Sequence, residues 1–165
     1  MSRMNLPSSA AVGRVASLHM HPAEPGAPLT TVNQIEVVAA KGINGESRYF
    51  GKLSRRTGQP SRRQLSLIER EQIAELAATL GLETIPPGAV RANIETTGIN
   101  LVELIGKQIQ IGDAILFVYE ARRPCQKMDA ICVGLRDLME NNRQGVMAEV
   151  IRPGTIRCKD SISCV

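Results

Sequence analysis

Short strand-like segments recur along the whole chain, and this pattern restricts the possible folds more than any other feature of the sequence. The segments are rich in Val, Ile and Thr, which pack well on a pleated surface, and glycine or proline turns separate them. We expect strands at residues 11–20, 31–40, 90–96, 107–111, 114–120 and 146–151, with a final hairpin from 153 to 165. So many short strands predict a mainly β fold, a β-barrel with two or three peripheral helices.

Two segments have helical spacing instead. Ser66 and Glu69 match a capping box, Gly81 supplies a stop, and the apolar residues between them fall on one helix face, at Ile73, Leu76, Ala77 and Leu80. A second helix is predicted over about residues 129–141, and a short helical turn at 100–105. We therefore expect the helices to cover the barrel rather than to form its core.

The length and the aromatic content limit the size and the composition of the core. The chain has 165 residues, enough for one domain, which we place at 10–165 after a flexible N-terminal segment at 1–9. It contains two Tyr, two Phe and no Trp, so the core must be aliphatic. Proteins that stack nucleic-acid bases on aromatic side chains need more of them, so no nucleic-acid partner is expected.

The sequence also indicates the compartment. No segment has the ~18 consecutive apolar residues of a membrane helix, and the first twenty residues lack the apolar stretch of a secretory signal. We therefore expect a cytoplasmic protein with no membrane partner and with free thiols, at Cys125, Cys132, Cys158 and Cys164. These cysteines lack Cys-x-x-Cys spacing and have no histidine nearby, which argues against a structural zinc site.

The charge is mildly basic, and the basic residues cluster. The formal net charge is +4, with arginine pairs at 55–56, 62–63 and 122–123. Solvated surface is the simpler interpretation of the first two pairs. The functional alternative is a site for a small anionic ligand such as a phosphate.

Cys125 carries the clearest chemical signal in the chain. It follows a predicted strand, and Arg122, Arg123 and Lys127 all lie within three residues of it. Nearby positive charge favours the thiolate, which is the form that attacks sulfur or binds a metal ion. Cys132, by contrast, lies between apolar residues of the predicted helix and fits a core position.

Other polar residues leave their roles open. Arg91 and Asn93 would share one face of a strand, where they either present a guanidinium and an amide to a ligand or face solvent. His19 and His21 are expected at the surface or in a loop. Residues 41–62 contain few apolar side chains and predict a long loop, a kind of segment that is often functional.

Seven short motifs follow one another in a fixed order from about residue 32 to the C-terminus, at 41–46, 63–68, 91–94, 106–112, 123–125, 145–150 and 154–160. The most specific is a cysteine after Arg-Pro, at Cys125. The series resembles the MOSC family, named after the C-terminal domain of molybdenum cofactor sulfurase. One departure concerns the first motif, because family members usually show Gly-Asp followed closely by Arg and then His or Tyr. Here Gly45 is followed by Glu46, and Arg48 and Tyr49 come one residue later.

The resemblance implies a barrel fold and an association with molybdenum cofactor (molybdopterin) or with sulfur transfer. In members that hold the cofactor, the cysteine matching Cys125 ligates molybdenum. By the same resemblance, the pterin and its phosphate are assigned to Lys41, Arg48, Arg91, Asn93 and Arg123. The chain itself is not expected to bind pyridoxal phosphate directly.

Three functions remain open from the sequence. The first is the terminal component of a reductase of N-hydroxylated compounds, with electrons from a separate redox partner protein. The second is a sulfur carrier, in which a sulfur donor loads Cys125 as a persulfide for metal–sulfur cofactor assembly. The third is a non-catalytic anion-binding barrel whose thiol has no role.

Cys125 is predicted to be the most reactive of the four thiols in the native protein, because three neighbouring cations stabilise its thiolate. Alkylation with iodoacetamide, followed by mass spectrometry of the peptides, gives a separate rate for each cysteine. Equal rates at all four positions would contradict a special role for Cys125.

Overall fold

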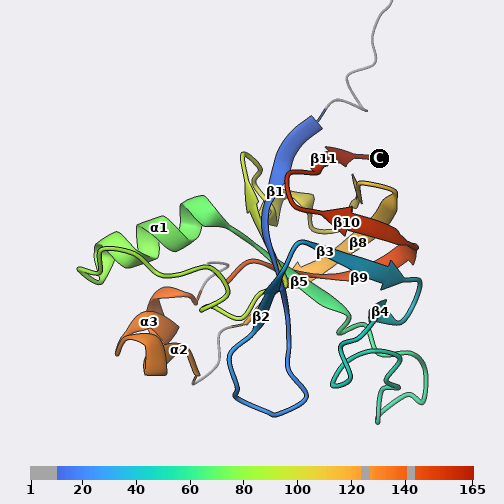
Figure 1. Cartoon of the computed structure of the whole chain (residues 1–165), viewed down its shortest axis with the longest axis horizontal. Helices are drawn as coiled ribbons and strands as arrows, with labels where there is room; N and C mark the ends of the chain where they lie inside the picture. The colour runs from blue at the N-terminus through green and yellow to red at the C-terminus, as the bar shows by residue number, and fades with distance from the viewer. Residues whose placement is uncertain (1–10, 124–126, 141–143) are drawn as a thin grey trace, which may run out of the picture.

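The computed structural model describes residues 11–123, 127–140 and 144–165. The N-terminal segment 1–9 and Cys125 lie outside this part of the chain. The main sheet has the strand order β11-β7-β8-β9-β5-β6-β1-β2, and β1 also pairs with β11. This pairing closes all the strands of the main sheet except β2 into a barrel (Figure 1). The predicted mainly β, barrel-like fold is confirmed.

The barrel strands are β1 (Ala11–Met20), β5 (Leu65–Glu69), β6 (Ile94–Thr97), β7 (Gln108–Ile111), β8 (Ala114–Ala121), β9 (Val146–Arg152) and β11 (Ser161–Cys164). β2 (Thr30–Val32) extends the sheet beyond β1. A second, three-stranded sheet has the order β10-β3-β4, with β3 at Gln34–Val38, β4 at Gly42–Ile43 and β10 at Gly154–Arg157. The short helices α2 (Lys127–Ile131) and α3 (Leu135–Leu138) and the 3-10 turn η2 (Val102–Leu104) complete the described elements, together with the helix α1 (Arg70–Thr79).

β5 is the barrel strand that the sequence did not predict. Its residues Leu65–Glu69 pair parallel with β6 and antiparallel with β9. Parallel neighbours need a crossover connection, and α1 provides part of it. Because Ser66 lies in this strand, the predicted capping box does not form, and Glu69 precedes α1 without a capping hydrogen bond from its side chain. Glu69 instead accepts a hydrogen bond from the backbone amide of Leu101, at 2.9 Å.

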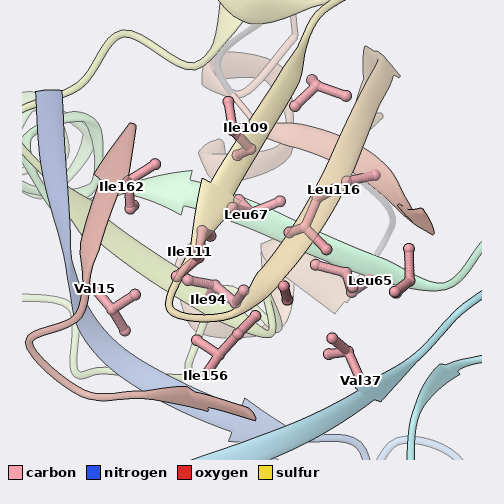
Figure 2. Packing of buried hydrophobic residues seen from close by; sticks show 14 of the residues in the cluster. Val15, Val37, Leu65, Leu67, Ile94, Ile109, Ile111, Leu116, Ile156 and Ile162 are labelled. Atoms are coloured by element: carbon pink, nitrogen blue, oxygen red, sulfur yellow. The ribbon is translucent and has the colours of Figure 1, made fainter. Parts of the chain in front are cut away.

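Aliphatic side chains fill the barrel, as expected from a chain with few aromatic residues. Those drawn in Figure 2 point toward one another from strands on all sides, among them Val15, Leu67, Ile94, Ile109, Leu116 and Ile162. A second cluster lies outside the barrel and joins α1 to α2 and α3, through Ile68, Ile73, Leu76, Met128, Leu135 and Met139. The buried run of β5 serves both clusters, because Leu67 faces the barrel interior and Ile68 faces the helices.

Several predicted elements agree with the structure. The strand at 11–20, the hairpin of β7 and β8, the strand β9 and the helical turn at η2 are all present. The helix α1 also ends as predicted, because Gly81 adopts a positive φ of 74° just after it. None of the described helices is long and apolar enough to span a membrane.

Three predicted elements differ from the structure. The strand expected at 31–40 is divided into β2 and β3, which belong to different sheets. The helix expected at about 129–141 is divided into α2 and α3, because Gly134 between them has a φ of 96°. The expected final hairpin does not form, since β10 pairs with β3 whereas β11 pairs with β7 and β1.

The cysteines in the described part of the chain are free thiols. Cys158 and Cys164 pack against the barrel core. Cys132 is only half-buried and belongs to neither core cluster, so the predicted core position is wrong. The helix ends before Cys132, at Ile131, so this thiol is not carried on the buried helix face.

His19 is fully buried in β1, contrary to the expectation of a surface or loop position. Its ring nitrogens lie 2.8 Å from the Ser17 hydroxyl and 3.2 Å from the Thr31 hydroxyl. The buried carboxylate of Glu95 lies 3.6 Å from the ring and forms an ion pair with Arg70 at 2.6 Å. Burial lowers the pKa of His19; Glu95 acts in the opposite direction, and the positive charge of Arg70 lowers the pKa further.

The free energy of unfolding is expected to fall as the pH drops below 6.5, with a contribution from His19. Its pKa is 6.5 in the absence of the fold and lower in the native state, so over this interval the unfolded chain binds more protons. Urea unfolding at several pH values between about 5 and 8 measures the slope. The slope should be shallower in His19→Gln, and parallel curves would show that His19 does not contribute.

Gly145→Ala is predicted to destabilise the fold strongly. A Cβ at this position would collide with the Leu67 carbonyl oxygen and lie 2.9 Å from the Cβ of Ile68. Gly106 is a matched control, because its φ of 89° is close to the 86° of Gly145 but nothing lies within 4 Å of its Cβ position. Gly106→Ala should cost about 1–2 kcal/mol for the left-handed backbone alone. Gly145→Ala should cost at least ~1–3 kcal/mol more in urea unfolding, and equal costs would contradict the predicted collision.

Candidate functional site

A cavity of about 990 Å³ lies where β1 and β8 end and where β5, β6 and β9 begin. Two further segments contribute to its wall, the loop that follows β4 and the helix α3. This volume is at the upper end of the ~300–1,000 Å³ typical of pockets for small molecules and cofactors. The chain therefore offers space for a ligand of cofactor size.

The wall of the cavity is strongly cationic. Six arginines line it against two glutamates, Glu46 and Glu120; the arginines are Arg48, Arg63, Arg91, Arg122, Arg123 and Arg136. Both tyrosines of the chain, Tyr49 and Tyr119, also line it. Guanidinium groups present planar, forked donors that match phosphate and carboxylate oxygens. The charge and the shape of these donors favour an anionic ligand.

Glu46 is the centre of a hydrogen-bonded cluster in the wall. Its side chain is 1% exposed, and its Oε2 accepts hydrogen bonds from the backbone amide of His21 at 2.7 Å and from Asn93 Nδ2 at 2.8 Å. The Nδ1 atom of His21 lies 2.9 Å from the same oxygen. The other oxygen, Oε1, is buried and has no hydrogen-bond partner among the described residues. Glu46, which stands where family members usually have the shorter Asp, thus holds several groups of the wall in place.

Asn93 connects three separate segments through its side chain. Its Oδ1 accepts a hydrogen bond from the Ser66 amide at 3.1 Å, and its Nδ2 donates to the His19 carbonyl at 3.0 Å as well as to Glu46. Both hydrogens of the amide are therefore used inside the protein. Asn93 thus positions Glu46, and a role of Asn93 in binding the cofactor stays a prediction.

Arg91 lies in a turn rather than on the predicted strand face, since β6 begins at Ile94. Its backbone has a φ of 65°, a left-handed conformation that is uncommon outside glycine. The guanidinium of Arg122 holds this turn by donating from Nη2 to the carbonyl oxygens of Val90 and Arg91, at 3.0 and 2.9 Å. Arg91 itself donates from Nη1 to the Ala27 carbonyl at 2.9 Å, while its buried Nη2 has no partner among the described residues.

Arg48 approaches the cavity from the loop after β4. Its guanidinium carbon lies 5.2 Å from the centre of the Tyr49 ring, which in turn contacts the His21 ring edge-on, with the centroids 5.0 Å apart. Its buried Nη1 also has no hydrogen-bond partner in the described part of the chain. Buried polar atoms are nearly always hydrogen-bonded, so unused donors on Arg48 and Arg91 and an unused acceptor on Glu46 indicate a binding site.

Tyr119 provides a neutral donor in the cavity wall. Burial raises the pKa of its phenol to about 12, and nearby Glu120 acts in the same direction. The guanidinium of Arg62 stacks on its ring at 4.1 Å from the centroid and forms an ion pair with Glu149 at 3.0 Å. Tyr119 therefore keeps its proton at neutral pH and can donate a hydrogen bond.

The structure brings together four of the five residues predicted for the cofactor. Arg48, Arg91, Asn93 and Arg123 all line the cavity, whereas Lys41 does not. Lys41 is exposed, and its ammonium lies 5.9 Å from the centre of the Phe50 ring. Cys125, the predicted catalytic residue and molybdenum ligand, lies outside the described residues.

Sequence reasoning missed several lining residues. His21 lies in a loop, as predicted, directly after the end of β1, but its side chain is mostly buried against Glu46. Glu46 could have been found from its place in the first motif, because a glutamate there still supplies a carboxylate. Tyr119 and Arg136 carry no signal in the sequence, since an alternating strand residue and a helical arginine are common on solvated surfaces.

Solved structures share this fold at low sequence identity. The YuaD protein from Bacillus subtilis aligns with a TM-score of 0.75 at 20% identity, covering 93% of this chain and 96% of that one. YiiM from Geobacillus stearothermophilus aligns with a TM-score of 0.72 at 16% identity, covering 93% and 75%. YiiM from Escherichia coli aligns with a TM-score of 0.65 at 19% identity, covering 92% and 69%. These similarities establish the fold alone.

No curated protein sequence matches the chain. The sequence model of the MOSC domain matches residues 44–163, which extend from the loop after β4 into β11. The matched region contains every lining residue of the cavity named above except His21. Because the match covers most of the chain, the protein belongs to the MOSC domain family.

Proposed function

We propose that the arginine-lined cavity binds molybdenum cofactor and that the protein is the terminal component of a reductase of N-hydroxylated compounds. The observation that carries the proposal is the pair of buried guanidinium nitrogens, Arg48 Nη1 and Arg91 Nη2, which have no partner among the described residues. The cofactor is a pterin with a phosphate group, and phosphate oxygens are strong acceptors for such donors.

The residues present fit the other parts of the cofactor as well. The buried Oε1 of Glu46 is an unused acceptor that suits the N–H donors at the edge of a pterin ring. The phenol of Tyr119 supplies a neutral donor, and the volume of about 990 Å³ suits a ligand of this size. Arg123 lines the cavity, and Cys125, which follows two residues later in the sequence, is the proposed thiolate ligand of molybdenum.

Each residue would have a separate task in this function. Arg48 and Arg91 would hold the phosphate, Glu46 would orient the ring, and Arg122 would hold the backbone turn that carries Arg91. The bound group would supply two-electron redox chemistry that no side chain of the protein can perform. A separate redox protein would supply the electrons.

Arg91→Lys is predicted to weaken retention of the cofactor, although it preserves the charge. Lysine has no forked donor, so it cannot bind the Ala27 carbonyl and the ligand at the same time. The loss of one charge-assisted hydrogen bond costs ~1.5–3 kcal/mol, which is roughly tenfold to a hundredfold in affinity. The protein should be purified from a host that synthesises the cofactor, and its molybdenum and oxidised pterin should be measured per chain.

Arg56→Lys is the matched control, because Arg56 is an exposed arginine outside the cavity. It should retain as much molybdenum and pterin as the wild type. Sulfane sulfur on Cys125 without molybdenum would replace the proposal with a sulfur carrier. Neither molybdenum nor sulfane sulfur in the wild type would leave a non-catalytic anion-binding barrel.

A further inference from the structure

His21 lines the cavity, and one of its two ring nitrogens is held by the protein. Its Nδ1 lies 2.9 Å from Oε2 of Glu46, a buried oxygen that also accepts hydrogen bonds from the His21 backbone and from Asn93. An ionised carboxylate only accepts hydrogen bonds, so Nδ1 must carry the hydrogen. The other nitrogen, Nε2, has no hydrogen-bond partner among the described residues, and the side chain is 12% exposed in the cavity wall.

Asn93 supports this assignment of the hydrogen. Its Nδ2 lies 3.3 Å from Nδ1 of His21 but only 2.8 Å from Oε2 of Glu46. If Nδ1 carries the hydrogen, the side chains of His21 and Asn93 both donate to Oε2 of Glu46, and all three side chains have a hydrogen-bond partner. A lone pair on Nδ1 would instead face the negative oxygen of Glu46 at 2.9 Å, which is repulsive.

The second histidine provides a comparison within the same molecule. Both ring nitrogens of His19 lie within hydrogen-bond distance of hydroxyl groups, of Ser17 and Thr31, and the residue is fully buried. His19 is thus a satisfied structural histidine. His21 differs because its orientation is fixed by a carboxylate while Nε2 stays accessible, the arrangement that suits an imidazole for proton transfer.

The charges around His21 connect its protonation to the binding of an anion. The His21 ring lies beside the Glu46 carboxylate, and Arg48 and Arg91 line the same cavity. The remaining charged and titratable groups of the wall are Tyr49, whose ring contacts that of His21, and Arg63, Tyr119, Glu120, Arg122, Arg123 and Arg136. An oxyanion bound among these arginines would offset their positive charge, so the bound anion and the added proton favour each other.

We propose that His21 is the proton-transfer residue of the cavity and that Glu46 positions it. When an oxyanion binds, Nε2 takes up a proton from solvent, and this proton can then pass to an oxygen atom of the ligand. In that step the Nε2–H bond breaks, an O–H bond forms from a lone pair of the oxygen, and no electrons are exchanged. The identity of the natural ligand rests on the proposed function, but proton uptake requires only an oxyanion.

Isothermal titration calorimetry with sulfate tests this inference. Sulfate does not titrate near neutral pH, so any proton that is taken up on binding must be bound by the protein. Titrations at pH 7 in two buffers of different ionisation enthalpy give the number of protons bound with each sulfate. We expect uptake of a fraction of one proton in the wild type and none in His21→Gln, which should still bind sulfate through the arginines.

Glu46→Gln should reduce the proton uptake, because an amide can accept the Nδ1–H hydrogen bond but does not stabilise the imidazolium charge. Equal uptake in the wild type and in His21→Gln would overturn the proposal. If sulfate binds without any proton uptake, the role of His21 fails while the anion-binding cavity stands. If sulfate does not bind to the wild type, both proposals fail.

Nitrogen NMR provides a readout that does not depend on a ligand. The chain has two histidines, and His21→Gln assigns their ¹⁵N signals. Neutral His21 is expected with its hydrogen on Nδ1, and sulfate should shift it toward the imidazolium form. A neutral ring with its hydrogen on Nε2 would contradict the positioning by Glu46 and would overturn the proposal.

Discussion

The side-chain amide of Asn93 is bonded to three segments at once, and the geometry of the cavity depends on these bonds. Its oxygen accepts a hydrogen bond from the backbone amide of Ser66, at the start of β5. Its nitrogen donates a hydrogen bond to the backbone carbonyl of His19, near the end of β1. The same nitrogen donates a second hydrogen bond to the carboxylate of Glu46, in the loop after β4. Because the same carboxylate holds His21, one buried amide fixes the relative positions of the polar groups on this side of the wall.

The cationic part of the wall requires a different kind of support. The turn that presents Arg91 has a left-handed backbone, which costs roughly 1–2 kcal/mol in a residue other than glycine. Arg122 offsets this cost with two hydrogen bonds to the carbonyl oxygens of the turn. One cavity arginine therefore positions another, and the guanidinium of Arg91 keeps a buried nitrogen available for a ligand.

Much of the fold could be predicted from the sequence, because the barrel strands with one exception have clear patterns and turns. The exception, β5, is a continuous apolar run, in which Leu67 packs inside the barrel and Ile68 packs against the helices. A run that is buried on both faces has no alternation, so the capping-box pattern at Ser66 predicts the start of a helix where the structure has a strand. The division of the predicted strand 31–40 between two sheets also left no local signal, since both halves are good strand formers.

The sequence by itself determined the mainly β class, the aliphatic core and the order of the motifs, since these follow from side-chain type and short-range spacing. It also pointed to Arg48, Arg91, Asn93 and Arg123 together through their motifs. Only the tertiary structure decided that Lys41 lies outside the cavity and that His21 lies in its wall. The hydrogen bonds of Asn93 to Ser66, Glu46 and His19 join residues that are 27, 47 and 74 positions apart in the sequence. Hydrogen bonds over such separations form only once the barrel has closed.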